Sequence, residues 1–292
     1  MNKRITWLVA LACMPFGASA ATTINPVNKH AYGANIGWLN AAGDTANGAV
    51  IGEYVCSGYI WGANVGWIHL GDGTPADGVR YRNDSASDYG INHDGQGNLR
   101  GYAYGANIGW IHFDDLGGAR VDLKTGNLSG FIYSANCGWI SLSNTSACVQ
   151  TDILQPGIDS DGDGIADAWE LSHTNSLAVF TATSDTDGDG ATDLNEHGAD
   201  TNPLDPNDLL RVTEYSVAFG PGEGTDTITW LSKPTRFYVV QSRSNLNAGA
   251  AWLDATSLLA PDAGPQTTAV IPFGPASSER YLRVQALKPL AP

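Results

Sequence analysis

The sequence of 292 residues predicts a mainly β protein with an N-terminal antiparallel β-repeat domain, a short loop segment carrying one or two short helices, and a C-terminal β-sandwich. Three observations support this prediction. A nine-residue aromatic pattern occurs four times before residue 150. Residues 151–208 are acidic and poor in apolar runs, whereas residues 209–292 contain six strand-like runs separated by turn residues. The 35 glycines favour turns and short strands over long helices.

The first twenty residues are typical of an export signal. Two basic residues precede the short apolar run Ile5–Ala12, and Ala18, Ser19 and Ala20 form a small-residue cleavage site. We therefore expect residues 1–20 to be a signal peptide and the mature chain to be secreted or held at the cell surface. The apolar run is too short to cross a membrane, so we expect no membrane insertion after cleavage.

The acidic composition excludes some classes of partner. Removal of Lys3 and Arg4 with the signal changes the formal net charge from −15 to −17, which argues against nucleic acid and anionic membranes as partners. Three cysteines then remain, and an exported compartment permits one disulfide among them. Cys137 with Cys148 is the most local pairing, and Cys56 with either is an alternative that the sequence leaves open.

Residues 21–150 contain the fourfold pattern, and we interpret each copy as two short strands joined by a tight turn. The copies "AYGANIGWL", "IWGANVGWI", "AYGANIGWI" and "IYSANCGWI" start at residues 31, 60, 103 and 132. Their spacings of 29, 43 and 29 residues indicate duplication of a doubled unit. We expect the repeated asparagines to adopt left-handed backbone or to bond the turn, and the repeated glycines to permit a positive φ. These positions are Asn35, Asn64, Asn107 and Asn136, and Gly37, Gly66, Gly109 and Gly138. With the flanking hairpins, ten to fourteen strands are predicted.

One tryptophan recurs in every copy: Trp38, Trp67, Trp110 and Trp139. Repeated aromatic residues are more often core than ligand contacts, so packing into the core is the preferred interpretation. The alternative is a row of exposed aromatic rings that stack on sugars. Strand alternation favours exposure to some extent, because it places Trp67 and His69 on the face opposite Ile68 and Leu70.

Residues 151–208 hold 14 of the 30 acidic residues and no Lys or Arg, and we do not expect this segment to fold around a hydrophobic core of its own. Two twelve-residue stretches carry carboxylates at positions 1, 3, 5, 9 and 12, glycine at position 6 and a backbone carbonyl ligand at position 7. The predicted ligands are Asp159, Asp161, Asp163, Ile165, Asp167 and Glu170 in the first, and Asp185, Asp187, Asp189, Ala191, Asp193 and Glu196 in the second. Oxygen ligands in this number predict Ca²⁺ rather than Zn²⁺. The alternative is a solvated acidic linker.

These two stretches, "DSDGDGIADAWE" and "DTDGDGATDLNEHGADTNPLDPND", resemble the thrombospondin type 3-like calcium repeats of secreted bacterial proteins. The resemblance implies calcium binding, an extracellular location, and Asp200, Asn202 and Asp205 as possible additional ligands. A dockerin is a rival, but dockerins normally place Asp at position 12 and follow it with a longer helix. The "GANIGWI" units are similar to repeats in uncharacterised secreted bacterial proteins that often carry the same calcium repeats and a C-terminal sandwich.

The last 84 residues predict about six or seven strands, which fits a small, fibronectin type III-like β-sandwich. The runs are "LLRVTEYSVAF", "DTITWLS", "RFYVVQSRS", "AWLDATSLL", "TTAVIPF" and "RYLRVQAL".

Motifs that would indicate an enzyme are missing from the sequence. It has no Gly-x-Ser-x-Gly, His-Glu-x-x-His or phosphate loop, and its six histidines show no ligand spacing. Asp114 and Asp115 form the least implausible candidate acid pair, but a turn is the preferred interpretation. We therefore expect a non-enzymatic, calcium-binding modular protein that acts in surface adhesion or in polysaccharide or matrix binding, with calcium rigidifying the spacer. The alternatives are a structural surface component without a small ligand, a dockerin-like scaffold and a polysaccharide-active enzyme.

Overall fold

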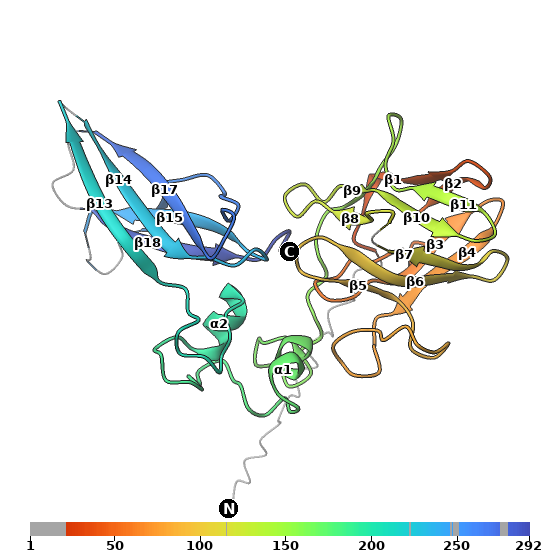
Figure 1. Ribbon diagram of the computed structural model, residues 1–292, viewed down its shortest axis with the longest axis horizontal. Coiled ribbons are helices and arrows are strands. Elements are labelled where there is room, and N and C mark those ends of the chain that lie inside the picture. Colours follow the sequence, from red (N-terminus) through yellow and green to blue (C-terminus); the bar gives the residue numbers. More distant parts are fainter. Residues whose placement is uncertain (1–21, 115, 222, 246, 248–250, 275–279) are drawn as a thin grey trace, which may run out of the picture.

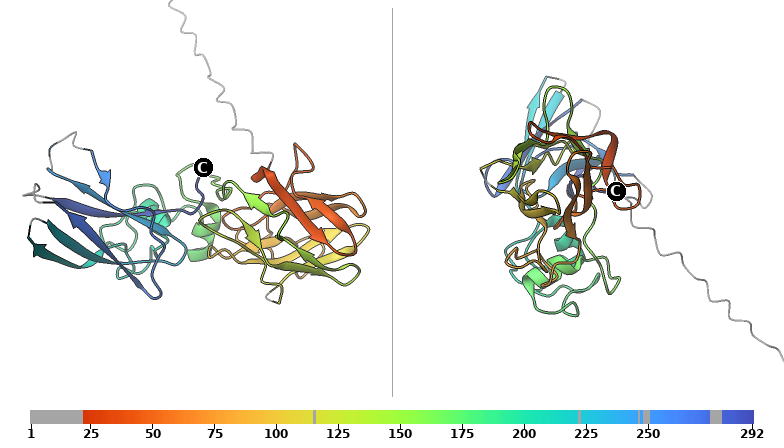
Figure 2. Two further views of the ribbon diagram at one scale, coloured as in Figure 1. Left: turned by 90° about the horizontal axis from the view of Figure 1, so that it is seen from above. Right: turned by 90° about the vertical axis from the view of Figure 1, so that its right-hand side faces the viewer.

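The computed structural model of the chain describes residues 22–114, 116–221, 223–245, 247, 251–274 and 280–292. The predicted signal peptide lies outside the described residues. Two β-rich parts lie side by side, and the two short helices lie in the segment that links them (Figures 1 and 2). Within the described ranges, no helix is long and apolar enough to cross a membrane.

The N-terminal part is an antiparallel barrel that is closed by eight strands. Its strands follow the order β1-β2-β3-β4-β6-β7-β10-β11, and β11 pairs back with β1. The barrel strands are β1 (Ile24–Gly33), β2 (Gly37–Asn40), β3 (Ser57–Gly62), β4 (Gly66–Asp72), β6 (Leu99–Gly105), β7 (Gly109–Phe113), β10 (Phe131–Ser134) and β11 (Gly138–Ser141). Shorter strands flank it: β5 (Ile91–His93), β8 (Arg120–Val121), β9 (Leu128–Ser129) and β12 (Val149–Thr151). Twelve described strands in this part confirm the predicted number.

Each copy of the pattern forms one hairpin of the barrel, as predicted. In all four hairpins an apolar pair faces inward, and the next pair along the strands is aromatic and faces outward. The inward pairs are Ala31 with Leu39, Ile60 with Ile68, Ala103 with Ile111, and Ile132 with Ile140. All eight inward residues are buried. A cavity of only about 20 Å³, lined in part by Ala31, Leu39, Ile60 and Ile132, lies among the buried side chains, as expected for a barrel of eight strands, whose interior side chains can fill.

The repeated glycine and asparagine serve different purposes. Gly66 has φ of 77°, and its three equivalents also have positive φ, which confirms the prediction for the glycines. The asparagines are not left-handed, so that part of the expectation is wrong. Their side chains instead reach the neighbouring hairpin: Asn64 Nδ2 donates to the carbonyl of Ile36 at 3.0 Å.

The same bond recurs around the barrel and closes a ring. Asn107 donates to Val65, Asn136 to Ile108, and Asn35 to Cys137, at 3.0–3.1 Å. Each amide also passes over the glycine of the hairpin to which it donates: a methyl group at Gly66 would lie 3.2 Å from Nδ2 of Asn107. Asparagine and glycine are therefore a matched pair between adjacent hairpins.

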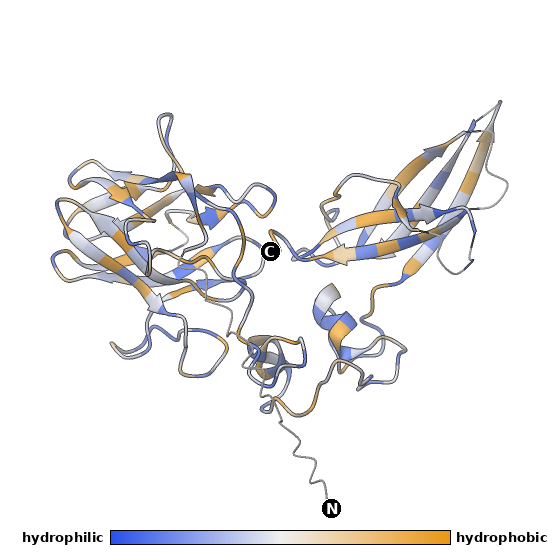
Figure 3. Cartoon of the chain, turned by 180° about the vertical axis from the view of Figure 1, so that it is seen from behind, coloured by the Kyte–Doolittle hydropathy of each residue, from blue (hydrophilic) through white to orange (hydrophobic). Residues whose placement is uncertain are grey.

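The C-terminal part consists of two three-stranded antiparallel sheets, β13-β14-β17 and β16-β15-β18. The strands are β13 (Val212–Gly220), β14 (Glu223–Leu231), β15 (Phe237–Arg243), β16 (Leu253–Asp254), β17 (Gln266–Phe273) and β18 (Tyr281–Leu287). Buried residues from both sheets, among them Trp230 and Tyr238, form one apolar cluster, so the sheets make the predicted sandwich. Hydrophobic and hydrophilic residues alternate along its strands (Figure 3).

The linking segment contains α1 (Asp167–His173) and α2 (Asp193–Ala199), which are the short helices that the sequence predicts. Its buried apolar cluster consists of Ile165, Trp169 and Phe180, with Leu194 and Tyr54 packed against it. All three buried residues belong to this segment, so it has a small core of its own, contrary to the expectation, and Tyr54 from a loop of the barrel part packs against that core.

The three cysteines within the described ranges are free, so none of the disulfides permitted by the sequence is formed. Cys56 is fully buried, and burial raises the pKa of its thiol to about 12.

Candidate metal centres and aromatic surface

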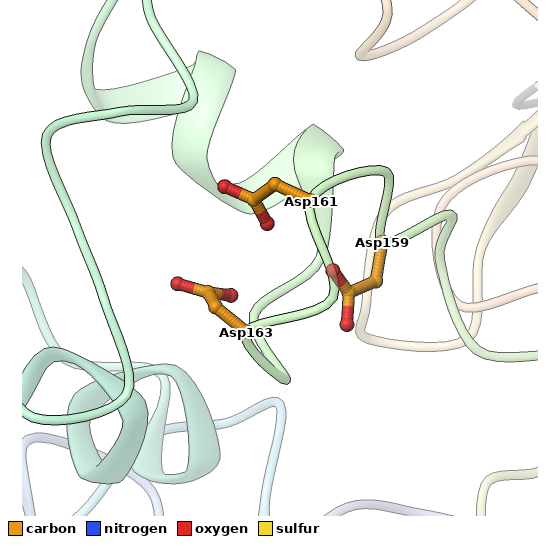
Figure 4. Close-up of side chains that lie close together, drawn as sticks. All are labelled: Asp159, Asp161 and Asp163. Carbon is orange, nitrogen blue, oxygen red and sulfur yellow. The ribbon is translucent and has the colours of Figure 1, made fainter. Parts of the chain in front are cut away.

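The first acidic loop brings three aspartates together. Asp159, Asp161 and Asp163 each offer one carboxylate oxygen, and these oxygens all lie within 4.8 Å of one another. Figure 4 shows the three side chains gathered on one loop immediately before α1. The second loop repeats this arrangement with Asp185, Asp187 and Asp189. Both triads could hold a metal ion.

Backbone bonds within each loop fix this arrangement. Asp159 accepts hydrogen bonds from the amides of Gly162 at 2.7 Å and Gly164 at 3.0 Å. Asp185 accepts the equivalent bonds from Gly188 at 2.8 Å and Gly190 at 3.0 Å. The four glycines have φ between 78° and 98°, a backbone conformation that other residues rarely adopt. The spacing of Asp and Gly therefore determines the curvature of both loops.

The glutamates at position 12, which are predicted ligands, lie on the adjoining helices and outside the two aspartate triads. Glu170 is 0% exposed and Glu196 is 1% exposed. Neither oxygen of Glu170 has a hydrogen-bond partner among the described residues. Oε2 of Glu196 also has none among them. Burial, together with the charges of neighbouring aspartates such as Asp161 and Asp187, raises the pKa of each carboxyl to about 7. A buried carboxylate without a partner is costly, so these oxygens fit a bound cation.

The same signature extends to the triads. The Oδ2 atoms of Asp163, Asp187 and Asp189 are also buried without a partner among the described residues. Burial raises the pKa of Asp163 and of Asp187, and nearby carboxylates add to the effect. The donor set in both loops is therefore oxygen only, and the oxygens that lack partners belong to predicted ligands.

The aspartates at position 9 have a second role that sequence spacing did not reveal. Asp167 accepts hydrogen bonds from the amide of Ser160 at 2.7 Å and from its hydroxyl at 2.5 Å. Asp193 accepts bonds from Ser184 and Thr186 in the same way. Both carboxylates thus tie the start of the loop to the first turn of the helix, and their assignment as direct ligands stays a prediction.

The position 7 residues join the loops to the helices. The amide of Ile165 donates to Asp163 at 2.8 Å, and that of Ala191 donates to Asp189 at 2.7 Å. The Ile165 side chain is fully buried in the small apolar cluster, which anchors the first loop. Their carbonyls as ligands also remain predictions.

The additional ligands implied by the resemblance lie in other interactions. Asp200 ends α2 in left-handed backbone and forms hydrogen-bonded and ionic contacts with Thr235 and Arg236. Asn202 and Asp205 accept bonds from nearby backbone amides in turns. None of the three belongs to either triad of described carboxylates.

Contacts around α2 connect the candidate metal centres to both β parts. Arg236 of the sandwich is buried and donates to the carbonyls of His197 at 2.9 Å and Gly198 at 2.8 Å. Lys288 contacts Glu53 of the barrel part at 3.2 Å and donates to Nε2 of His197 at 3.2 Å. His197 directly follows Glu196, so the second loop ends at the point where the two β parts meet.

The four tryptophans face outward, so the preferred prediction that they form the core is wrong. Trp38, Trp67, Trp110 and Trp139 are 49%, 42%, 40% and 46% exposed. Residues such as Leu39 and Ile68 fill the barrel on the opposite face of the same strands, which leaves no room inside for indole rings.

Each tryptophan belongs to an aromatic triad, a term used here for three rings presented by one hairpin. The triads are His30, Tyr32 and Trp38; Tyr59, Trp61 and Trp67; Tyr102, Tyr104 and Trp110; and Phe131, Tyr133 and Trp139. Ring centroids within them lie 4.6–6.3 Å apart. The first ring of each triad was missed from the sequence, although its place two residues before the second ring, on the same strand face, was a usable signal.

Asp114, the first residue of the candidate acid pair, lies in a turn. The Asp114 carboxylate accepts bonds from the amides of Leu116 at 3.1 Å and Gly117 at 3.2 Å, which is a turn. Asp115 lies outside the described residues.

Comparison with models of protein families, with curated proteins and with solved structures finds no match for this chain. The likeness to thrombospondin type 3-like repeats therefore rests on the two acidic loops alone.

Proposed function

We propose that this chain is an exported, non-enzymatic calcium-binding protein in which two Ca²⁺ ions stiffen the segment between the barrel and the sandwich. The barrel then presents its aromatic surface to a polysaccharide of the cell surface or matrix. The exposed aromatic triads favour this role over a purely structural one, since a structural component has no need of repeated exposed rings.

The observation that carries the proposal is the pair of buried glutamates. Glu170 and Glu196 are enclosed and retain carboxylate oxygens without partners among the described residues. A solvated acidic linker, the alternative from the sequence, would leave both side chains in water. A cation that fits inside the loop would neutralise the crowded negative charge and would be coordinated by these oxygens.

Calcium fits the donor set better than other metals. Carboxylate and carbonyl oxygens in a flexible loop suit Ca²⁺, whereas Zn²⁺ prefers Cys and His and Mg²⁺ demands near-octahedral geometry. Glu170 has both carboxylate oxygens available to an ion. Glu196 has only one, because its Oε1 accepts a hydrogen bond from the Thr201 hydroxyl at 3.1 Å. The first site therefore offers the more complete bidentate ligand.

The residues next to the two glutamates connect the acidic loops to the contact between the two β parts. Trp169 precedes Glu170 and His197 follows Glu196, and the two rings lie 5.3 Å apart. His197 is in turn held by Arg236 and Lys288 from the sandwich part. Ions that hold both glutamates in place therefore hold α1 against α2. The position of α2 in turn determines the positions of both β parts.

Thermal unfolding of the full chain tests this proposal. Extracellular calcium modules bind with dissociation constants of about 10⁻⁴–10⁻³ M, so millimolar Ca²⁺ should add on the order of 1–2 kcal/mol per site. We expect Tm to rise by roughly 5 °C or more over the value in EGTA, and Glu170→Gln to lose about half of that rise. Glu214→Gln, an exposed carboxylate on β13, is the matched control and should keep the full rise.

A Tm that ignores both Ca²⁺ and EGTA would refute the proposal. An equal rise with Zn²⁺ in place of Ca²⁺ would refute the assignment of the ion.

A further inference from the structure

One of the four aromatic triads lies under a loop that breaks the regularity of the repeat. The second and third copies of the pattern are 43 residues apart, whereas the other neighbours are 29 apart. The extra residues include 83–89, which fold back over β6 and β7. Gly101 of β6 permits this approach, because a methyl group there would lie 2.2 Å from the carbonyl oxygen of Gly90.

The loop is held in one shape by its own side chains. Asn83 adopts φ of 58° and accepts a bond from the amide of Gly90 at 3.0 Å. Asp88 is buried and accepts bonds from the amides of Arg82 at 3.1 Å and Ala76 at 3.2 Å. A loop fixed in this way makes a preformed wall, which lowers the entropic cost of binding.

Tyr89 joins the wall to the aromatic surface. Its ring lies edge-on to Trp110, with centroids 4.9 Å apart, and its hydroxyl bonds Nδ1 of His69 at 2.7 Å. The two rings are therefore perpendicular, and Tyr89 connects His69 of the second hairpin with Trp110 of the third.

The result is a pocket of about 310 Å³ with an aromatic floor and a polar wall. The floor contains Tyr102, Trp110 and His112, and the wall contains Asp84 and Ser85. Asp84 is exposed, and its carboxylate makes no hydrogen bond or ion pair among the described residues. Its oxygens are thus available to a ligand.

We propose that this pocket binds one pyranose ring of a neutral polysaccharide, a proposal that rests on the polysaccharide-binding part of the proposed function. The C–H face of a pyranose carries partial positive charge and matches the negative face of the Trp110 ring, while its hydroxyls are donors for Asp84 and partners for Ser85 and His112. Asp84 and the formal net charge of −15 disfavour uronic or sulfated sugars.

Isothermal titration calorimetry of the full chain in millimolar Ca²⁺ tests the pocket. The probes are cellohexaose, mannohexaose and chitohexaose, with hexagalacturonate as the anionic comparison. We expect binding of at least one neutral probe, weaker binding of hexagalacturonate, and a loss of about tenfold or more in affinity on Trp110→Ala or Asp84→Ala. Trp38→Ala, the equivalent exposed position of the first hairpin, should lower affinity much less than Trp110→Ala, and Glu214→Gln, an exposed carboxylate of the sandwich part, is the control that should leave affinity unchanged. Far-ultraviolet circular dichroism confirms that each variant is folded.

The outcomes separate failure of the pocket from failure of the proposed polysaccharide binding. An equal loss of affinity in Trp38→Ala and Trp110→Ala would overturn the pocket and keep a polysaccharide-binding surface. Absence of binding to every neutral probe would overturn both the pocket and that part of the proposed function. Preference for hexagalacturonate would overturn the assignment to neutral sugars.

Discussion

At the scale of single residues, the fourth hairpin shows how two substitutions in the repeat compensate each other. Three copies have glycine before the turn and Ile or Val within it: a methyl group at Gly33 would lie 2.7 Å from Cγ1 of Ile36, and Gly62 and Gly105 are equally tight. The fourth copy has Ser134 and the smaller Cys137 instead. Both are buried, so the space gained by the cysteine accommodates the serine.

This compensation predicts strong coupling between the two positions. Cys137→Ile alone should overpack the end of the barrel and lower the free energy of unfolding by about 1–3 kcal/mol. Adding Ser134→Gly to Cys137→Ile should restore most of the lost free energy of unfolding, because the double variant has the same pair of residue types as the other hairpins. Chemical denaturation of the two single variants and the double variant measures the coupling, and additive effects would contradict the packing argument.

The two buried glutamates predict an unusual pH dependence. Their pKa is about 7 in the folded, metal-free chain, above the ordinary value of 4.5. A raised pKa stabilises the fold fully below the ordinary value and loses that contribution as pH rises through about 7. In EGTA we therefore expect a lower Tm at about pH 8 than at about pH 5.

Millimolar Ca²⁺ should remove this difference, since the deprotonated carboxylates are then ligands. The variant Glu170→Gln, Glu196→Gln should show a weaker pH dependence in EGTA. A metal-free chain that is more stable at the higher pH would contradict the assignment.

At the scale of elements, the ring of asparagine bonds holds the four hairpins to one another at one end of the barrel. Asn64→Ala removes the bond to Ile36 and leaves a partly buried carbonyl unpaired. We expect a loss of about 0.5–1.5 kcal/mol in the free energy of unfolding for this change and for Asn107→Ala, and a smaller loss for Asn136→Ala, because Ser134 Oγ also donates to the carbonyl of Ile108 at 3.3 Å. Thermal or urea unfolding checks this, and values near zero at all three positions would show that the ring is incidental.

The sequence predicted local features better than contacts between hairpins. Period-two alternation predicted the strands, and the spacing of Asp159, Asp161 and Asp163 predicted the aspartate triad. Both features depend on residues that are close in the chain. The role of Asn64 was missed because its partner, Ile36, lies 28 residues away. The burial of Trp67 was wrongly predicted because only closure of the barrel decides which strand face is the inside. The bonds of Asp167 to Ser160 were hidden because the loop pattern assigns position 9 to the metal.

At the scale of the whole molecule, the end of the sandwich part contacts the barrel. Lys288 links Glu53 and His197, the amide of Leu154 donates to the carbonyl of Leu290 at 3.0 Å, and Leu290 packs against the barrel core. Because His197 belongs to α2, this joint should depend on the order of α2. The acidic segment is therefore the part of the chain where calcium has the largest effect on shape.

This view predicts calcium-dependent protection from proteolysis. In EGTA, we expect cleavage between the two acidic loops, at residues 174–184, to accelerate by about tenfold or more relative to millimolar Ca²⁺. Lys288→Ala should increase cleavage modestly in both conditions, since it loosens the joint without touching a loop. Lys124→Ala, an exposed lysine on the barrel, is the control. Equal cleavage rates with and without Ca²⁺ would show that the ions do not order the segment.

Calorimetric titration of the metal-free full chain with Ca²⁺ tests the central claim most directly. We predict two ions per chain, one fewer in Glu170→Gln, and none in the variant that also carries Glu196→Gln. No detectable heat of binding at millimolar Ca²⁺, or a stoichiometry that the two substitutions leave unchanged, would contradict it.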